Sequence, residues 1–282
     1  MIKETPKPHL HILDGGVGKH LQFSSLIPAI HKKYEQKLSI TSAYPETLKN
    51  CPEVALSICT HVDPIVATWK NLLNKYDKIF YFNPYLGNFL KGDTHVITEW
   101  SNLYDVKINN VRPNFEINKE REKMIRNSIL ELGKFILVQF SGGQGILSNS
   151  YNEENQGRSY KYGQELINIL KEEYPNINII VFKHPNEQEE YLGETKSIFN
   201  TREDFMILSK YCLTFICIDS ALQHMVSNIK FNKKGIVLWG ATEPHRFGYE
   251  NNVNIISHYP YCVEIPAKEI IDKLSKMEIN ND

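Results

Sequence analysis

The sequence predicts an α/β protein built from two Rossmann-like halves. Short apolar runs alternate with amphipathic stretches along nearly all of the 282 residues, and this alternation is typical of strands followed by helices. A charged amphipathic helix near residue 120 interrupts the series, and a second series of strands and helices follows it. A chain of this length can form two domains of about 120–150 residues each. We therefore expect domains at 1–118 and 119–262 with a cleft between them. A C-terminal helix is expected within 263–282, and the sequence leaves open whether this helix packs back against the first domain.

In the first half, three short apolar runs predict strands, and two stretches with apolar residues near helical spacing predict helices. The expected strands are 9–13, 37–42 and 77–82, and the expected helices are about 19–34 and 96–103.

The second half begins with a helix over 117–132, which Gly133 is suited to end because glycine readily adopts the backbone conformations found after helices. The strands that follow are continuous apolar runs, as in a parallel sheet that is buried on both faces. The expected strands are 135–140, 177–182, 213–218 and 235–239, and the expected helices are 160–173, 202–210, 220–229 and 266–277.

Composition and charge restrict the class of protein. Hydrophobic residues make up 41% of the chain and charged residues 23%, which excludes intrinsic disorder. The net charge of −1 gives no general signal for nucleic-acid binding. The chain has no run of about 18 apolar residues that could span a membrane, and its N-terminal residues lack the apolar segment of a signal peptide. The five cysteines are odd in number and form no Cys-x-x-Cys pair, so we expect reduced thiols in a cytoplasmic enzyme.

A glycine-rich turn follows the first strand, between Asp14 and Lys19. Glycines such as Gly16 and Gly18 let the backbone approach a ligand, and the start of the following helix offers N–H groups to an anion. The turn also looks like the phosphate loop of an ATPase, but that loop needs a Ser or Thr after the lysine, where this chain has His20. The remaining alternative is a tight turn that binds no ligand.

Three segments of the second half follow predicted strands, which is where ligands bind in open α/β sheets. They are 140–144, 217–224 and 238–246. The first supplies small residues, the second a helix start whose N–H groups can face a phosphate, and the third a hydroxyl, a carboxylate and a guanidinium. Each segment alone has an ordinary structural explanation, and it is their order and spacing that indicate a function.

The order of these motifs resembles the family 9 glycosyltransferases, whose best-known members are the ADP-heptose lipopolysaccharide heptosyltransferases. That family opens with a strand, a glycine-rich turn and a helix containing proline, as 15–18 and Pro28 do here. Its second domain carries an Asp-Ser/Thr-Gly-x-x-His motif, matched by 219–224, and a Gly-x-Thr-x-Pro motif, matched by 240–244. The resemblance covers most of the chain and is best over 134–250.

The resemblance implies a GT-B architecture, in which two Rossmann-like α/β/α domains face each other across a cleft. It also implies a metal-independent, inverting transfer of a sugar to a hydroxyl acceptor on a glycan, a lipid-linked glycan or another molecule. The donor would be a nucleotide-diphosphate sugar, ADP-heptose or another, and no metal or further cofactor is expected. The residues assigned to the donor by motif and position are Gly16, Gly18, Ser141, Gly142, Gly143, Arg158, Lys161, Lys183, His184, Asp219, Ser220, Ala221, His224, Thr242, Glu243 and Arg246. Of these, Arg158 or Lys161 would be the basic partner of the phosphates.

Two departures from the family pattern concern catalysis and donor binding. The family commonly has an aspartate after the last glycine of the first turn, where it is the base for the acceptor hydroxyl, and this chain has Lys19 there. A lysine at this place suits electrostatic stabilisation of a leaving diphosphate rather than proton abstraction. Ala221 replaces the usual glycine of the second-domain motif. The candidates for the base are then Asp14, His20 and, within 84–105, Asp93, His95 and Glu99.

Other functions are compatible with the same pattern, because one fold hosts many activities. A nucleotide-sugar epimerase or hydrolase and a non-catalytic nucleotide- or sugar-binding protein share the GT-B fold. A phosphate-loop ATPase is the third alternative.

Overall fold

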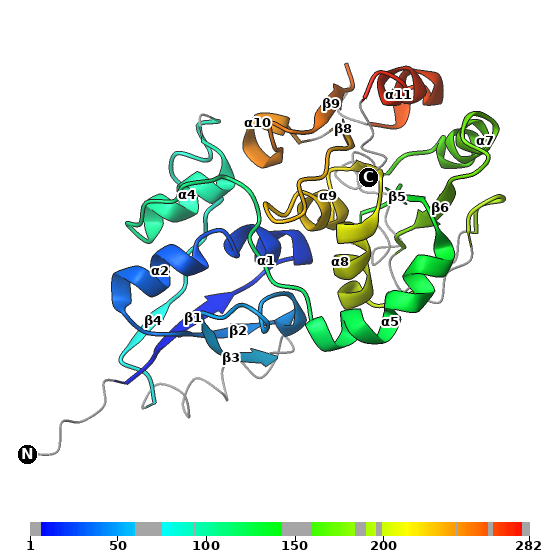
Figure 1. The fold of residues 1–282 in the computed structure, drawn as a ribbon. Coiled ribbons are helices and arrows are strands. Elements are labelled where there is room, and N and C mark those ends of the chain that lie inside the picture. Colours follow the sequence, from blue (N-terminus) through cyan, green and yellow to red (C-terminus); the bar gives the residue numbers. More distant parts are fainter. Residues whose placement is uncertain are drawn as a thin grey trace, which may run out of the picture. The chain divides into compact units, whose positions relative to one another are not determined.

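The fold comes from a computed structural model of the 282-residue chain. The residues that it describes are 7–59, 75–92, 94–142, 159–183, 190–195, 199–240, 242–258 and 262–277. The chain divides into two compact units, 1–116 and 117–282, each containing one parallel sheet and its helices (Figure 1). The sequence analysis places the boundary after residue 118. Among the described residues, every helix is too short or too polar to cross a bilayer.

The first unit contains a four-stranded parallel sheet with the order β3-β2-β1-β4. Its strands are β1 (His9–Leu13), β2 (Leu38–Ser42), β3 (Val54–Cys59) and β4 (Lys78–Phe80). The sequence pattern predicts β1, β2 and β4 but not β3. This edge strand is partly exposed, and Ser57 interrupts its otherwise apolar sequence.

The helices of the first unit are α1 (Val17–Phe23), α2 (Ile27–Tyr34), the short 3-10 turn η1 (Pro45–Thr47) and α4 (Val96–Leu103). The single helix predicted over 19–34 is therefore two helices. Proline near the start of α2 cannot donate a backbone hydrogen bond to the preceding turn. The hydroxyl of Ser24 accepts a hydrogen bond from the Asn114 N–H at 2.8 Å, and this contact holds the break between the helices.

Two histidines of β1 lie among the aromatic side chains of the first unit. His11 is 1% exposed, stacks on Phe80 with 4.9 Å between ring centroids, and its Nδ1 lies 3.1 Å from the Tyr104 hydroxyl. Burial lowers the pKa of His11 to about 3, so the ring is neutral at physiological pH. It serves as a polar member of the core.

The second unit contains a five-stranded parallel sheet with the order β6-β5-β7-β8-β9. Its strands are β5 (Phe135–Gln139), β6 (Asn178–Val181), β7 (Thr214–Ile218), β8 (Ile236–Trp239) and β9 (Val253–Ile256). All but β9 are predicted from the sequence. The two-unit α/β architecture with parallel sheets is confirmed.

The helices of the second unit cover both faces of this sheet (Figure 1). They are α5 (Lys119–Leu132), α7 (Gly163–Glu173), α8 (Arg202–Tyr211), α9 (Ala221–Val226), α10 (Pro244–Phe247), the 3-10 turn η2 (Cys262–Glu264) and α11 (Ala267–Leu274). On one face, α7 and α11 lie side by side, and their apolar residues share a core cluster with every second residue of β5, β7 and β8. These contacts of α11 lie within the second unit. From the sequence alone, packing of this helix against the first unit was an open alternative.

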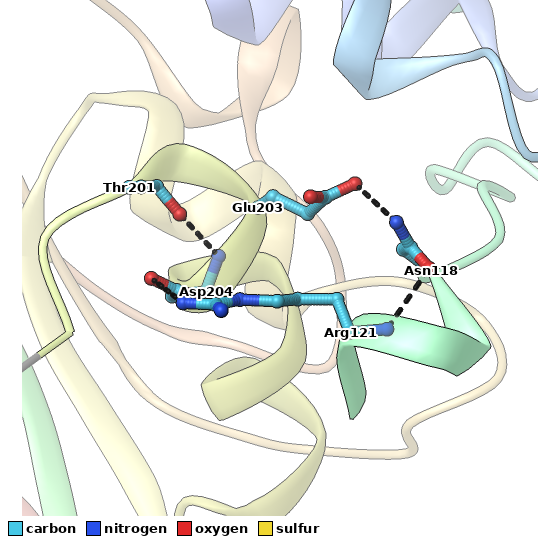
Figure 2. A network of polar contacts seen from close by, with 5 residues as sticks. All are labelled: Asn118, Arg121, Thr201, Glu203 and Asp204. Atoms are coloured by element: carbon cyan, nitrogen blue, oxygen red, sulfur yellow. Dashed lines mark hydrogen bonds and ion pairs between the residues drawn. The ribbon is translucent and has the colours of Figure 1, made fainter. Parts of the chain in front are cut away.

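A polar network joins α5 to α8 (Figure 2). The guanidinium of Arg121 donates two hydrogen bonds to the carboxylate of Asp204, from Nε at 2.7 Å and from Nη2 at 3.2 Å. The Asp204 side chain is fully buried. The side chains of Thr201 and Asn118 accept hydrogen bonds from the backbone N–H groups of Asp204 and Arg121, the third residues of α8 and α5. The Asn118 amide also donates to Glu203 at 3.0 Å. The starts of the two helices are therefore fixed to each other by side chains.

We expect Arg121→Gln to lower the free energy of unfolding by about 1–3 kcal/mol at pH 7, because it leaves the buried Asp204 carboxylate without its main partner. Burial raises the pKa of Asp204, but the hydrogen bonds and charge of Arg121 outweigh this effect and lower it. The stabilisation by the pair is therefore present above the ordinary aspartate pKa and is lost as the pH falls through the lowered one. Urea unfolding at pH 7 and at about pH 3 tests this, with the exposed Lys123→Gln on the same helix as the control. A constant difference between wild type and Arg121→Gln at both pH values would contradict the account.

Candidate functional site

The predicted site residues lie at the carboxyl edges of the two sheets, each within its own unit. In the first unit, the glycine turn follows β1, and the segment after β4 lies beside it because β1 and β4 pair in parallel. In the second unit, the segments after β5, β7 and β8 are neighbours because these three strands are adjacent. Gly143, Arg158 and His184 of the donor set, and the alternative base Asp93, lie outside the described residues.

The glycine turn brings Asp14 and Lys19 together. Gly15 has φ +82°, and a β-carbon there would lie 3.0 Å from the Lys19 side chain, so a glycine lets the lysine fold back over the turn. The Lys19 ammonium forms an ion pair with Asp14 Oδ1, and the hydroxyl of Tyr81 donates to Asp14 Oδ2 at 2.7 Å. Both carboxylate oxygens therefore have partners.

The surroundings of Lys19 stabilise its ion pair with Asp14. Lys19 is 7% exposed, and its Nζ lies 5.0 Å from the centre of the Tyr85 ring and 5.8 Å from that of Trp100, within range of a cation–π attraction. Partial burial raises the pKa of Asp14, but the hydrogen bonds from Lys19 and Tyr81 outweigh it and lower the pKa. Asp14 is thus an ionised carboxylate held in one orientation, while the lysine's charge is already matched.

His20 is enclosed. Its Nδ1 lies 2.9 Å from the carbonyl oxygen of Gly16, its ring meets that of Tyr44 edge-on, and it is 0% exposed. Burial lowers its pKa, so the ring is neutral. Since the Gly16 carbonyl needs a donor, Nδ1 carries the proton, and the buried Nε2 has no hydrogen-bond partner among the described residues. The two turn glycines predicted to face the donor, Gly16 and Gly18, lie at the start of α1, where Gly16 is exposed.

In the second unit, Gln139 joins two of the predicted segments, and the sequence analysis misses it. Its Oε1 accepts hydrogen bonds from the Ser220 hydroxyl at 2.5 Å and from the Leu222 N–H at 3.2 Å. Its Nε2 donates to the Ser141 carbonyl oxygen at 2.9 Å. The Ser220 hydroxyl proton and one N–H of the first turn of α9, which the sequence analysis offers to a phosphate, are therefore used within the protein.

Asp219 joins the segments after β7 and β8. Its Oδ1 accepts a hydrogen bond from the Gln223 amide, and its Oδ2 accepts one from the Thr242 hydroxyl at 2.7 Å. It is 7% exposed. The carboxylate thus orients the Thr242 side chain, and Ser141, Asp219, Ser220 and Thr242 form one connected group at the edge of the sheet.

The other predicted donor residues have separate partners. His224 is 5% exposed, and its Nδ1 lies 2.6 Å from the Tyr249 hydroxyl. The Glu243 Oε2 lies 3.5 Å from the Nε of Arg246, a residue of α10. Lys183 forms an ion pair with Glu194 at 2.6 Å.

Three further members of the donor set are Lys161, Gly142 and Ala221. The Lys161 Nζ lies 4.8 Å from the centre of the Tyr162 ring, and Lys161 is exposed. Gly142 is buried three residues after the end of β5, and Ala221 is the first residue of α9. Within the described part of the chain, no group of three or more His, Cys, Asp or Glu side chains is placed to hold a metal ion.

Comparison with solved structures identifies the fold. Heptosyltransferase II, the ADP-heptose lipopolysaccharide heptosyltransferase of E. coli, superposes with a TM-score of 0.69 at 12% identity, over 95% of this chain and 97% of that one. A family 9 glycosyl transferase from Veillonella parvula gives 0.70 at 11% identity, over 95% and 96%. The E. coli heptosyltransferase WaaC with ADP gives 0.65 at 11% identity, over 95% and 99%. The chain therefore has the GT-B fold of the family 9 heptosyltransferases, as the sequence analysis expects.

No protein-family model matches the chain, and no curated protein matches it in sequence. The likeness is therefore one of fold. Because the sequence identity is so low, the role of each site residue has to be inferred from its own chemistry.

We expect Gln139→Leu to lower the free energy of unfolding by about 1–3 kcal/mol, because it leaves the Ser220 hydroxyl and the Leu222 N–H without their acceptor in a buried place. Gln164 is the matched control. It also makes three hydrogen bonds, to Asn168 and to the backbone of Leu192, but at the surface, where water can replace them. Urea unfolding of both leucine variants gives the comparison, and equal losses would contradict a special role for Gln139.

Proposed function

We propose that this GT-B protein is a glycosyltransferase that moves a sugar from a nucleotide-diphosphate donor, an ADP-sugar first of all, to a hydroxyl group. The observation that carries the proposal is the likeness in fold to heptosyltransferases over 95% of the chain, one of them solved with ADP. The grouping of Ser141, Asp219 and Thr242 at one sheet edge supports it, because ligands of open α/β sheets bind outside the carboxyl ends of the strands.

The donor's diphosphate would lie at this edge of the second sheet. The Ser141–Gly142 turn, which Gln139 holds, is the group that would contact the diphosphate. The Thr242 hydroxyl donates its proton to Asp219, so its oxygen would accept a hydrogen bond from a hydroxyl of the sugar. Arg246 and Lys161 are described cations of this unit that would approach the phosphates, Arg246 by leaving Glu243. Lys183 is bound to Glu194 and would border the nucleoside rather than neutralise a phosphate.

Asp14 is the base that we propose for the acceptor hydroxyl. It is ionised, 45% of its side chain is exposed, and Lys19 holds it in place. The acceptor oxygen would attack the anomeric carbon of the donor, its proton would pass to Asp14, and the nucleoside diphosphate would leave with the bonding electrons. Lys19 would then orient Asp14 rather than stabilise the leaving group, and enclosed His20 would take no part. The transfer would be metal-independent, as the family resemblance implies.

A second candidate is a sugar-nucleotide binding protein without catalysis. This second function is favoured by the hydrogen bonds that both Asp14 oxygens already accept, from Lys19 and from Tyr81. A hydrogen-bonded carboxylate with a lowered pKa is a weaker base.

A donor screen in EDTA separates these functions. Thermal unfolding is followed with ADP-, UDP-, GDP- and CDP-sugars, since a ligand that binds the folded state raises its melting temperature. Release of the nucleoside diphosphate is then measured with the donor that binds. We expect an ADP-sugar to raise the melting temperature and to be turned over in EDTA.

Two variants complete the screen. Asp14→Asn should keep the thermal shift and lose turnover by about 100-fold or more, the size of a general-base contribution. Asp219→Asn should weaken the thermal shift, because it disturbs Thr242, with Asp105→Asn on the surface of the first unit as the control. Binding without turnover in the wild type would favour the second candidate. Turnover abolished by EDTA and restored by Mg²⁺ would contradict the metal-independent mechanism.

A further inference from the structure

Asp14, the proposed base, has two side-chain partners that differ in exposure. Lys19, whose ammonium lies on Oδ1, is 7% exposed and is enclosed by aromatic rings. Tyr81, whose hydroxyl lies on Oδ2, is 54% exposed. A hydroxyl group that approaches the Asp14 carboxylate from solvent therefore meets the Tyr81 side of the carboxylate and not the Lys19 side.

Tyr81 is held by little besides this hydrogen bond. Among the described residues its hydroxyl has no partner other than Asp14, and its ring makes no aromatic or cation–π contact. Its two neighbours in the chain are packed, since the ring centroids of Phe80 and Phe82 lie 5.6 and 4.8 Å from that of Tyr104. The backbone on either side of Tyr81 is thus fixed, and the Tyr81 side chain can turn towards solvent without disturbing the core.

The protonation states determine what the hydrogen bond does. The bond to Asp14 is the main cause that raises the pKa of Tyr81, so Tyr81 keeps its proton and donates it. Burial raises the pKa of Asp14, but the hydrogen bonds from Lys19 and Tyr81 outweigh this effect and lower it. While Tyr81 is in place, Asp14 is therefore occupied at Oδ2 and is a weaker base than a carboxylate without this bond.

We propose that Tyr81 is a specificity-determining residue that covers Asp14 until an acceptor hydroxyl displaces it. This role rests on the proposed function, because it assigns Tyr81 to the choice between the acceptor and water. Water would only exchange one hydrogen bond for another, and the Tyr81 hydroxyl is tethered beside Oδ2. An acceptor that is bound through other contacts presents its hydroxyl at a high effective concentration and can replace Tyr81.

The two competing reactions differ only in the nucleophile. In transfer, the acceptor oxygen forms a bond to the anomeric carbon, its proton passes to Asp14, and the nucleoside diphosphate leaves with the electrons of the broken bond. In hydrolysis, water takes the place of the acceptor and free sugar is released. Tyr81 keeps its own proton in both reactions. A cover that a bound acceptor displaces and water does not favours transfer over loss of the donor.

The first experiment needs no donor. The carbon-13 signal of the Asp14 carboxyl, identified by its absence in Asp14→Asn, is followed by NMR as the pH is changed. The pKa of Asp14 should be higher in Tyr81→Phe than in the wild type, because the carboxylate loses a hydrogen bond. The melting temperature should stay the same, since Tyr81 is exposed and unpacked. An unchanged titration, or a marked fall in melting temperature, would overturn the proposal.

Tyr211→Phe is the matched control. The Tyr211 hydroxyl donates to the carboxylate of Glu122, and both residues belong to the second unit. The variant therefore removes the same kind of hydrogen bond without touching Asp14. It should leave both the titration of Asp14 and the turnover of the donor as in the wild type.

The second experiment measures hydrolysis of the donor. ADP-heptose and the ADP-, UDP-, GDP- and CDP-derivatives of glucose are incubated with the protein in EDTA without an acceptor, and release of the nucleoside diphosphate is measured. Tyr81→Phe should release it about 2- to 10-fold faster than the wild type, the range expected when a competitor loses one hydrogen bond. The double variant Tyr81→Phe/Asp14→Asn should lose this increase, because Tyr81 acts through Asp14.

The outcomes separate this proposal from the proposed function. Equal hydrolysis by the wild type and Tyr81→Phe, or an increase that persists in the double variant, would remove the role of Tyr81 and leave the transferase. Hydrolysis that appears only in Tyr81→Phe would support both. If neither the wild type nor Tyr81→Phe turns over any of these donors, the transferase is removed and the role of Tyr81 with it.

Discussion

The amide of Gln139 connects the end of β5 with the start of α9, and the proposed donor site depends on this connection. Its oxygen accepts from Ser220 and Leu222 while its nitrogen donates to Ser141. A parallel sheet brings strand ends together only approximately, because each loop after a strand has its own freedom. One buried side chain with three hydrogen bonds removes that freedom for two loops at once. Asp219 connects the segments after β7 and β8 in the same way, because it accepts a hydrogen bond from Thr242.

In the first unit an ion pair fixes the carboxylate of the glycine turn, whereas in the second unit neutral donors bind to Gln139 and Asp219. Lys19 is buried against Tyr85 and Trp100 and matched by Asp14, so the charge contributes to local order. The same pairing keeps Asp14 ionised and fixed. An ionised and oriented carboxylate is what the base proposed above requires.

The fold could be predicted from the sequence because its strands are apolar runs buried on both faces, as 135–139 and 214–218 are. The edge strands β3 and β9 could not, because one polar residue, Ser57 or Asn254, interrupts each apolar run. The strands that precede the motif segments, β1, β5, β7 and β8, were predicted, but the side-chain partners of the motif residues were not. Gln139 is the last residue of an apolar strand and gives no signal of its own, and Tyr81 lies 67 residues from Asp14. Glu99 was among the candidates for the base, but only the structure shows that its carboxylate is buried without a partner.

The central claim is that a nucleotide sugar binds at the carboxyl edge of the second sheet, on the groups that Gln139 and Asp219 position. A crystal structure of the protein soaked with ADP in EDTA tests it most directly. The account predicts density for the diphosphate within hydrogen-bond distance of the Ser141–Gly142 turn. A diphosphate bound instead at the glycine turn of the first unit, in contact with Lys19, would contradict it.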